Sequence, residues 1–291
     1  MEAIQLLIGG VANGCVYGLV ALGFVLIYKA TESVNFAQGD MMMLGAFLTL
    51  QFVNAEYWAM PFLVGVTLAT IIMVIMTYGM QAVVVRQLFG QPQFAVVILT
   101  IAIGFVLRFI AGFIWGHEPL NLETPFAGQN VSFAGLALSM DEVFVILVTV
   151  VLMVVLYLFF QKTKLGVAMQ ASSQNQLAAY YMGVPVQQVH SMVWALAGGI
   201  ATIAGVMFAA RGAIDPSLGL LGIKAFAAAV IGGFGSLPGA LAGGLIIGII
   251  EPFAGRYFPA GYSQIAPYAI MLLVLVFRPN GLFSQIQAKK A

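Results

Sequence analysis

Charge is scarce in this sequence. Only 7% of its 291 residues are Asp, Glu, Lys or Arg, whereas 62% are hydrophobic. A soluble domain usually carries about 25% charged residues, and a soluble fold of this length has no means of burying so much apolar surface. The composition therefore predicts an integral membrane protein. The net charge of +1, with no long basic run, argues against nucleic-acid binding.

Cysteine and histidine are nearly absent too. Cys15 is the only cysteine, which excludes an intrachain disulfide. His117 and His190 fall on opposite sides of the expected membrane, so they cannot share a metal. No G-x-S-x-G and no G-x-x-x-x-G-K-[ST] occurs, and no second membrane aspartate accompanies Asp40. We therefore expect no catalytic residues, no metal and no cofactor in this chain. Because the start also lacks a basic region, we expect no cleaved signal peptide.

The sequence does contain a series of long, continuously apolar runs. A spanning helix needs about 20 mostly apolar residues, and runs without alternation favour helices over a barrel. The sequence thus predicts an all-α polytopic membrane protein with a single domain over residues 1–291. About nine spans are expected, with eight as the alternative if residues 218–253 cross only once, and a re-entrant pair in that region is also left open. The runs are Ile4–Tyr28, Gly39–Val53, Met60–Val85, Phe94–Ile114, Val143–Gln161, Val189–Ala210, Leu218–Phe234, Leu237–Phe253 and Gln264–Phe277.

The distribution of basic residues predicts the orientation, because Lys and Arg concentrate on the cytoplasmic side of a membrane. This bias favours an external N-terminus and a cytoplasmic C-terminus. Residues 115–142 then form an external loop, and residues 162–188 form a cytoplasmic one. In this orientation the internal basic residues are Lys29, Arg86, Lys162, Lys164, Arg278, Lys289 and Lys290, and the external ones are Arg211 and Arg256.

Two polar or glycine-rich stretches interrupt the apolar runs. "NFAQGD" spans residues 35–40 and "GGFGSLPGA" spans residues 232–240. Such breaks in corresponding halves of a transporter often line a cavity, although an ordinary cytoplasmic turn explains the first equally well. We expect Gly39 to permit a turn and Asn35 to satisfy freed backbone groups. Glycines at every fourth position predict close helix packing, either within the chain or against a partner subunit. They are Gly10, Gly14 and Gly18, then Gly235, Gly239 and Gly243.

A few polar residues lie within the apolar runs. The charges of Arg108 and Glu251 are energetically costly there unless they are ion-paired or hydrated. Alternatively, each charge lies at the outer membrane interface, which Arg108 reaches by snorkelling and where Glu251 lies beside Arg256. Asn13 and Tyr17, one turn apart, either face a cavity or form hydrogen bonds between helices. The residues predicted to line a translocation path are Asn13, Tyr17, Asn35, Phe36, Gln38, Gly39 and Gly235.

Three separated motifs resemble the branched-chain amino-acid ABC permease family of the LivH type. They are "NGCVYGLVALGFVLIYKATESVNFAQGDMMMLGAF" from residue 13, "KAFAAAVIGGFGSLPGALAGGLIIGIIE" from residue 224, and "FRPNGLF" from residue 277. The resemblance implies a non-enzymatic importer subunit in the bacterial cytoplasmic (inner) membrane. Its implied partners are a second homologous permease, two cytoplasmic ATPases that bind the ATP, and an external solute-binding protein. Relatives carry branched-chain or other amino acids, urea, amides or aromatic acids, so the solute stays open. A stand-alone secondary carrier is the runner-up.

The 162–188 loop contains "GVAMQASSQNQLAAYYMGVP", which resembles the E-A-A coupling motif of ABC permeases, although Gln170-Ala171-Ser172 departs from it. The implied ATPase-coupling residues are Gln170, Ala171, Gln174, Asn175, Leu177, Ala178, Ala179, Tyr181 and Gly183. From the residues alone we expect a short helix, capped by Ser172 or Ser173 and ended by Gly183 and Pro185. Its apolar stripe of Leu177, Tyr180, Tyr181 and Val184 suits a groove on the ATPase, or else the chain's own membrane helices.

Overall fold

Each of the nine apolar runs forms a helix in the computed structural model, which describes residues 2–88, 91–133 and 136–283. Within these residues, six helices are long and apolar enough to cross a membrane. They are α1 (Glu2–Thr31), α3 (Phe62–Gly79) with its extensions η1 (Met80–Val84) and η2 (Val85–Leu88), α4 (Gln93–Trp115), α5 (Met140–Lys162), α8 (Val186–Ala209) and α10 (Leu237–Tyr257). The shorter helices are α2 (Gln38–Val53), α9 (Leu221–Gly232), which follows the 3-10 turn η3 (Pro216–Leu220), and α11 (Tyr262–Phe277).

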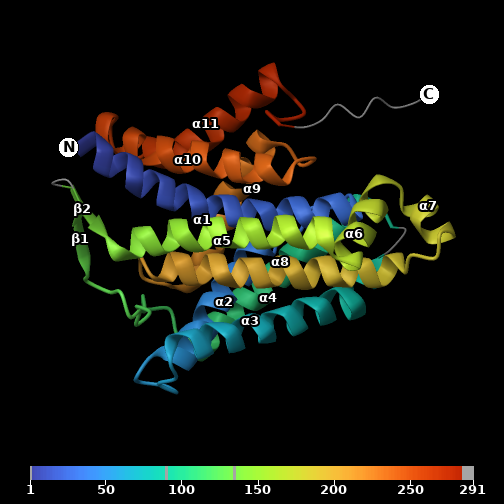
Figure 1. The fold of residues 1–291 in the computed structure, drawn as a ribbon, viewed down its shortest axis with the longest axis horizontal. Coiled ribbons are helices and arrows are strands. Elements are labelled where there is room, and N and C mark those ends of the chain that lie inside the picture. Colours follow the sequence, from blue (N-terminus) through green and yellow to red (C-terminus); the bar gives the residue numbers. More distant parts are fainter. Residues whose placement is uncertain (1, 89–90, 134–135, 284–291) are drawn as a thin grey trace.

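The two long loops carry structure of their own at opposite ends of the bundle (Figure 1). One end holds a hairpin of β1 (Asn130–Phe133) and β2 (Leu136–Ser139), paired antiparallel with Asn130 opposite Ser139. We call it the hairpin end. The other end holds α6 (Lys164–Gln174) and α7 (Gln176–Tyr181), and we call it the α7 end. The all-α expectation holds for the membrane-embedded part, and this short hairpin in the first loop is an addition that the sequence did not predict. Which end faces the cytoplasm stays a prediction, and Lys289 and Lys290 lie outside the described residues.

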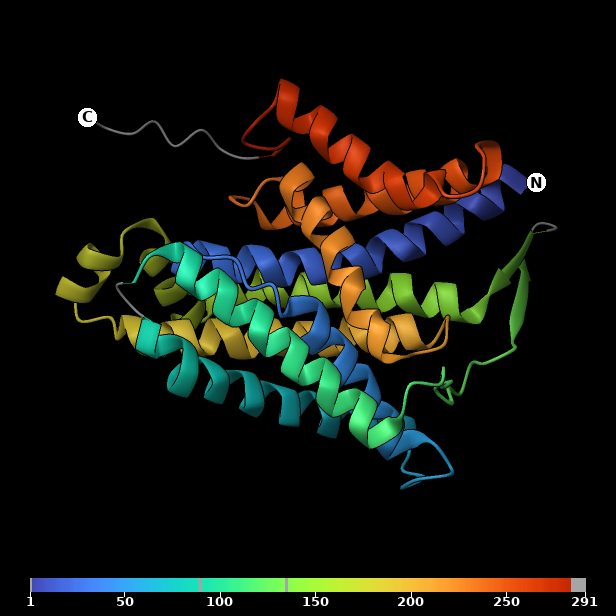
Figure 2. The same cartoon turned by 180° about the vertical axis from the view of Figure 1, so that it is seen from behind.

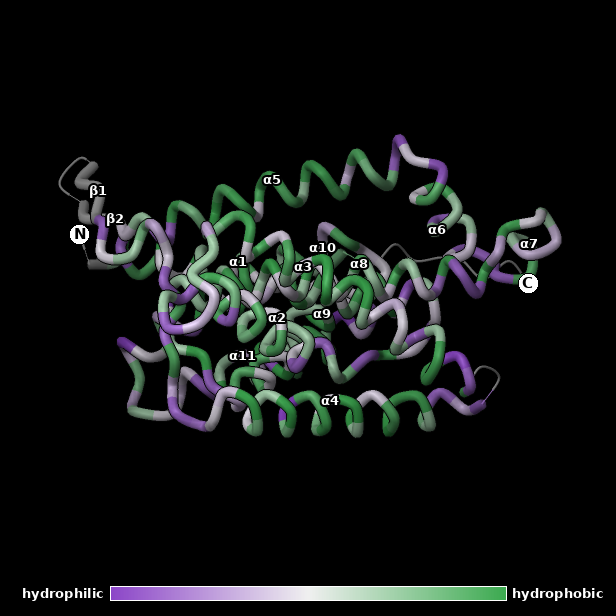
Figure 3. The backbone as a smooth tube through the Cα atoms, turned by 90° about the horizontal axis from the view of Figure 1, so that it is seen from below, coloured by the Kyte–Doolittle hydropathy of each residue, from purple (hydrophilic) through white to green (hydrophobic). Residues whose placement is uncertain are grey.

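Helix α1 is the centre of the bundle. In the most apolar 18-residue stretch of α1, 89% of the residues are buried, whereas in the corresponding stretches of α3 and α5 only 22% are buried. Figure 3 shows α4 and α5 as strongly hydrophobic helices on opposite outer sides. Large apolar side chains such as Leu63, Phe113 and Val276 are exposed on the outer helices. A surface of this composition is suited to lipid rather than to water.

Glycines bring α1 and α10 into backbone contact. A Cβ on Gly14 would lie 2.7 Å from Leu245 Cα, and a Cβ on Gly244 or Gly248 would overlap the backbone of Gly18 or Gly14. Such close approach gives membrane helices their dispersion contact. The intramolecular interpretation is confirmed for Gly10, Gly14 and Gly18, and also for Gly239 and Gly243, where a Cβ would overlap the backbone of Gly232 and Ala228 in α9.

Two interrupted helix pairs cross inside the bundle. After α1, residues 32–37 lead to α2; after α8, residues 210–215 lead to η3 and α9. Figure 2 shows the start of α2 and the η3–α9 segment crossing near the middle of the molecule. A Cβ on Gly39 would lie 2.7 Å from Gly222 Cα. Gly39 is the second residue of helix α2, so the expectation that it permits a turn is wrong. Its missing side chain is needed for the crossing.

The second break also differs from expectation. "GGFGSLPGA" contains the turn between α9 and α10, where Gly233 has φ +96° and Ser236 caps α10 by accepting from Gly239 N–H. The counterpart of "NFAQGD" in the second half of the chain is instead residues 210–215, which connect α8 to η3 and α9. The end of α9 is covered by the "FRPNGLF" motif, because Leu282 N–H donates to Ile231 O (2.9 Å) and Phe283 N–H to Gly232 O (3.1 Å). Carbonyls at the end of a helix need such partners.

Candidate functional site

The start of α2 is buried inside the chain, where polar side chains form hydrogen bonds with the backbone. Asn35 and Gln38 are fully buried. Asn35 Oδ1 accepts from Ala37 N–H (3.1 Å), which confirms that Asn35 satisfies a freed backbone group. Gln38 Nε2 donates to Ala197 O on α8 (3.2 Å). Phe36, which is partly buried, packs against Phe226 of α9 with 5.3 Å between ring centroids. These residues hold α2 against α8 and α9, and their role in a translocation path stays a prediction.

An ion pair ties the same turn of α2 to α4. Arg108 donates to Asp40 Oδ1 through Nη2 (2.9 Å) and Nε (3.2 Å). The Asp40 side chain is only 6% exposed. Arg108 therefore does not snorkel to the interface, and the ion-paired alternative is confirmed. Because unpaired charges at membrane depth are costly, each group of this pair makes the other tolerable.

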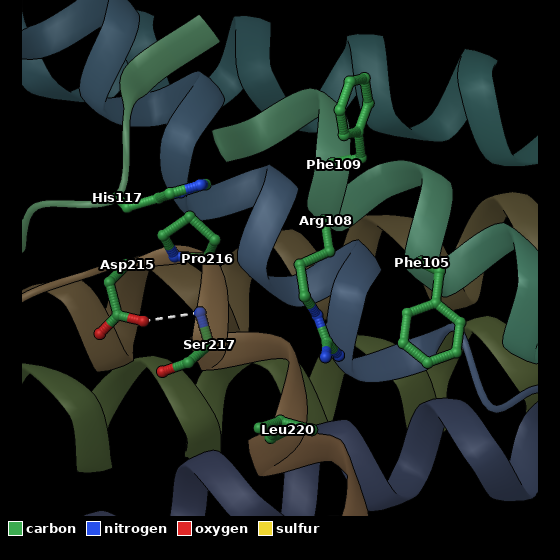
Figure 4. Close-up of a pocket in the computed structure, with 8 residues that line it drawn as sticks. All are labelled: Phe105, Arg108, Phe109, His117, Asp215, Pro216, Ser217 and Leu220. Carbon is green, nitrogen blue, oxygen red and sulfur yellow. Dashed lines mark hydrogen bonds between the residues drawn. The ribbon is translucent and has the colours of Figure 1, made fainter. Parts of the chain in front are cut away.

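A shallow pocket of about 470 Å³ lies beside this pair (Figure 4). Asp215 shapes one wall, because its Oδ1 accepts from Ser217 N–H (2.6 Å) and caps η3. Apolar rings form the other wall, and both Phe105 and Phe109 are exposed in this chain. The lining residues are Phe105, Arg108, Phe109, His117, Asp215, Pro216, Ser217 and Leu220.

A second charged cluster joins three helices. Tyr17 on α1 donates its hydroxyl to Glu251 Oε2 (2.6 Å), and Lys224 Nζ on α9 donates to Glu251 Oε1 (2.5 Å). Glu251 on α10 is thus ion-paired, as one of the two sequence alternatives expected. Lys224 and Asp40 were missed as partners. Each is a charge at the edge of or within an apolar run, the same signal that identified Arg108 and Glu251.

The polar face of α1 continues from this cluster toward the hairpin end. Asn13 Oδ1 accepts from Arg211 Nη1 (2.5 Å), and Arg211 Nη2 lies 3.5 Å from Glu142 Oε1. A pocket of about 290 Å³ opens here, lined by Gln5, Leu6, Gly9, Asn13, Arg211 and Pro252.

The turn around Gly235 lies elsewhere. The neighbouring Phe234 ring packs on Tyr28 with 4.7 Å between ring centroids. Tyr28 is about three helical turns from Tyr17 on α1. Gly235 thus lies apart from Asn13 and Tyr17, and its role in a translocation path stays a prediction.

At the α7 end, α7 presents apolar side chains to the outside. Leu177 is 70% exposed and Tyr181 is 82% exposed, whereas Ala179 is buried. The expected serine cap is wrong: Asn175 caps α7, because its Oδ1 accepts from Ala178 N–H (2.9 Å). The expected stop is confirmed, since Gly183 has φ +84° and Val184 N–H donates back to Ala179 O (3.0 Å).

The stripe on α7 is divided between two environments. Tyr180 is exposed together with Leu177 and Tyr181, whereas Val184 packs against the chain's own core. One contact links α7 to the centre of the bundle: Gln176 Nε2 donates to Ala30 O in the last turn of α1 (2.9 Å). The three exposed residues of the stripe therefore have no cover among the described residues, while the helix itself is anchored to α1.

Comparison with known proteins adds a family assignment. Residues 6–275 match the family described as branched-chain amino acid transport system / permease component. The chain is 29% identical to the high-affinity branched-chain amino acid transport system permease protein BraD of Pseudomonas aeruginosa, over 99% of this chain and 97% of that protein. It is 28% identical to the permease protein LivH of Escherichia coli K12, with the same coverage. A probable branched-chain amino acid transport permease of Methanocaldococcus jannaschii is 29% identical over 91% of this chain and 87% of that protein.

Proposed function

The chain belongs to the family of branched-chain amino acid transport system permease components, and from this membership we propose that it is the membrane-spanning subunit of a bacterial ABC importer. It is a multi-pass membrane protein that forms the translocation path for branched-chain or other amino acids. It binds no ATP itself and performs no catalysis. Its single domain, residues 1–291, pairs with a second homologous permease in the cytoplasmic membrane.

The exposed apolar face of α7 is the observation that carries the coupling part of this proposal. A helix of six residues is too short to persist alone in water. Here it is anchored by Gln176 and the turn at Gly183, yet it leaves Leu177, Tyr180 and Tyr181 exposed. An amphipathic helix of this kind is recognised by an apolar groove. We assign that groove to the cytoplasmic ATPase, so that its closure moves α7 and, through Gln176, the end of α1.

The orientation follows from the same assignment. If α7 meets a cytoplasmic ATPase, the α7 end is cytoplasmic, and the hairpin end faces the external solute-binding protein. This orientation agrees with the distribution of basic residues, and it gives nine crossings when α2, η3–α9 and α11 each count as one. Between the ends, the polar residues of α1 and the crossing of α2 with η3–α9 border the path.

Site-directed cross-linking to the co-purified ATPase tests this function. A cysteine replacing Tyr181, in a Cys15→Ala background, is expected to cross-link to the ATPase. The matched control replaces Met169, which lies in α6 of the same loop but is buried and should not cross-link. Equal cross-linking at both positions, or at neither, would show that the ATPase does not dock on α7. Robust gradient-driven uptake by the permease alone would favour a secondary carrier instead.

A further inference from the structure

The Lys224–Glu251 ion pair is partly open although it lies among membrane-spanning helices. The side chains of Lys224 and Glu251 are 22% and 16% exposed, so both charges are accessible, whereas in the other ion pair Arg108 is 25% exposed but its partner Asp40 only 6%. A charged group that faces hydrocarbon is strongly unfavourable, so an open pair at this depth borders water or a polar surface. Its position on α9 and α10, with Tyr17 of α1 as third partner, places it where three helices meet.

One face of α1 connects this pair with the hairpin end. Gln5, Gly9, Asn13 and Tyr17 are spaced by four residues, so they share that face. The first three line the pocket of about 290 Å³, together with Pro252, the residue after Glu251. Tyr17 then donates directly to Glu251. A solute that enters this pocket therefore meets the polar side chains of Asn13 and then Tyr17 on the way to the ion pair.

We propose that Lys224 and Glu251 form a binding site for a solute that carries both an ammonium and a carboxylate group, in other words a free amino acid. The proposal rests on the proposed transport function and specifies what passes through the path. Lys224 binds the solute carboxylate, Glu251 binds its ammonium group, and Tyr17 stays hydrogen-bonded to Glu251. Asn13 and Arg211 stand one turn nearer the hairpin end and form the entrance.

Charge balance selects this class of solute over the others. Without solute, Lys224 and Glu251 neutralise each other. A zwitterion can separate them because it supplies a new partner to each. Urea or a neutral amide would leave both charges without a counterion, and an aromatic acid would pair Lys224 while adding a like charge next to Glu251. Leaving either charge without a counterion away from bulk water is unfavourable, so the zwitterion opens the pair at the lowest cost.

Uptake by the complete transporter in proteoliposomes separates binding from a purely structural role. The variants are Glu251→Gln, Lys224→Met and the double variant Lys224→Met/Glu251→Leu, which leaves no unpaired charge. We expect L-leucine uptake to fall about tenfold or more in all three, while loaded binding protein still stimulates ATP hydrolysis. Recovery of uptake in the double variant would overturn the proposal, because a pair that only holds α9 to α10 can be replaced by apolar side chains. Loss of stimulation already in the parent protein would instead count against the ABC assignment.

A second experiment needs only this chain in liposomes. A Gln5→Cys variant in a Cys15→Ala background places a thiol at an exposed position in the lining of the pocket of about 290 Å³, on the face of α1 that leads to the ion pair. We expect a water-soluble maleimide to label it, and L-leucine to slow the labelling. Three matched compounds with the same branched chain, namely 4-methylpentanamide, 4-methylpentanoate and isopentylamine, should not protect, nor should L-leucine after Glu251→Gln. Equal protection by the amide, or no labelling at all, would overturn the assignment.

Discussion

The crossing of α2 with η3–α9 depends on the absence of a side chain at Gly39. A Cβ at this position would overlap Gly219 O and would lie 2.7 Å from Gly222 Cα and 2.8 Å from Gly222 N. Carbon atoms in contact are normally about 3.5–4.0 Å apart. A Gly39→Ala substitution therefore pushes the two segments apart by roughly 1 Å. Because the obstacles are backbone atoms, no side chain can rotate away to relieve the overlap.

Overpacking of this kind costs about 1–3 kcal/mol, and Gly39→Val should cost more. We expect Gly39→Ala to lower the melting temperature of the purified protein and to reduce uptake more than it reduces the amount in the membrane. Gly79→Ala is the matched control, because Gly79 is helical and its Cβ would meet nothing within 4 Å. Alanine is favoured there by about 0.5–1 kcal/mol. If both variants melt and transport alike, the close crossing is refuted.

Three further predictions concern the ends of the bundle. Cysteines replacing Glu123 and Gln174, both exposed, should react with an impermeant reagent from opposite sides of the membrane; labelling of both from outside would contradict the topology. Tyr181→Asp and Gly183→Asp should leave the amount of permease unchanged yet abolish ATPase stimulation by loaded binding protein. Normal uptake in both would show that the ATPase docks elsewhere. Gly281→Val should detach the C-terminal motif from α9 and lower the melting temperature, because Gly281 has φ +85° and a Cβ there would overlap the Gly233 backbone. An unchanged melting curve would contradict this close approach.

Apolar length was sufficient to predict the helices. All nine runs became helices, with ends that shifted by a few residues, because continuous hydrophobicity leaves a membrane chain few alternatives to helix. Which of the interruptions between apolar runs lies inside the bundle was not predictable. "GGFGSLPGA" reads as a stronger interruption than the residues before α9, yet it is a turn between helix ends. Whether a break lies inside or beside the bundle depends on tertiary packing, such as the contact of Gly39 with Gly222.

For the polar residues, too, the sequence identified some of the features and the structure was needed for the rest. Single charges in apolar runs pointed to Arg108 and Glu251, and the structure supplied their partners, Asp40 and Lys224. Pairing across 68 or 27 residues depends on which helices are neighbours, and a single sequence does not contain that information. The cap of α7 was misassigned because Ser172, Ser173 and Asn175 all have suitable side chains. Only the start of the helix at Gln176 decides among them.

We propose that this chain transports solute only when an ATPase acts on α7. Proteoliposomes that contain the permease with its homologous partner, the ATPases and the external binding protein test it most directly, compared with proteoliposomes from which only the ATPases are omitted. We expect ATP-dependent uptake of L-leucine in the first preparation and none in the second, even with an imposed ion gradient. Comparable uptake without the ATPases would contradict it.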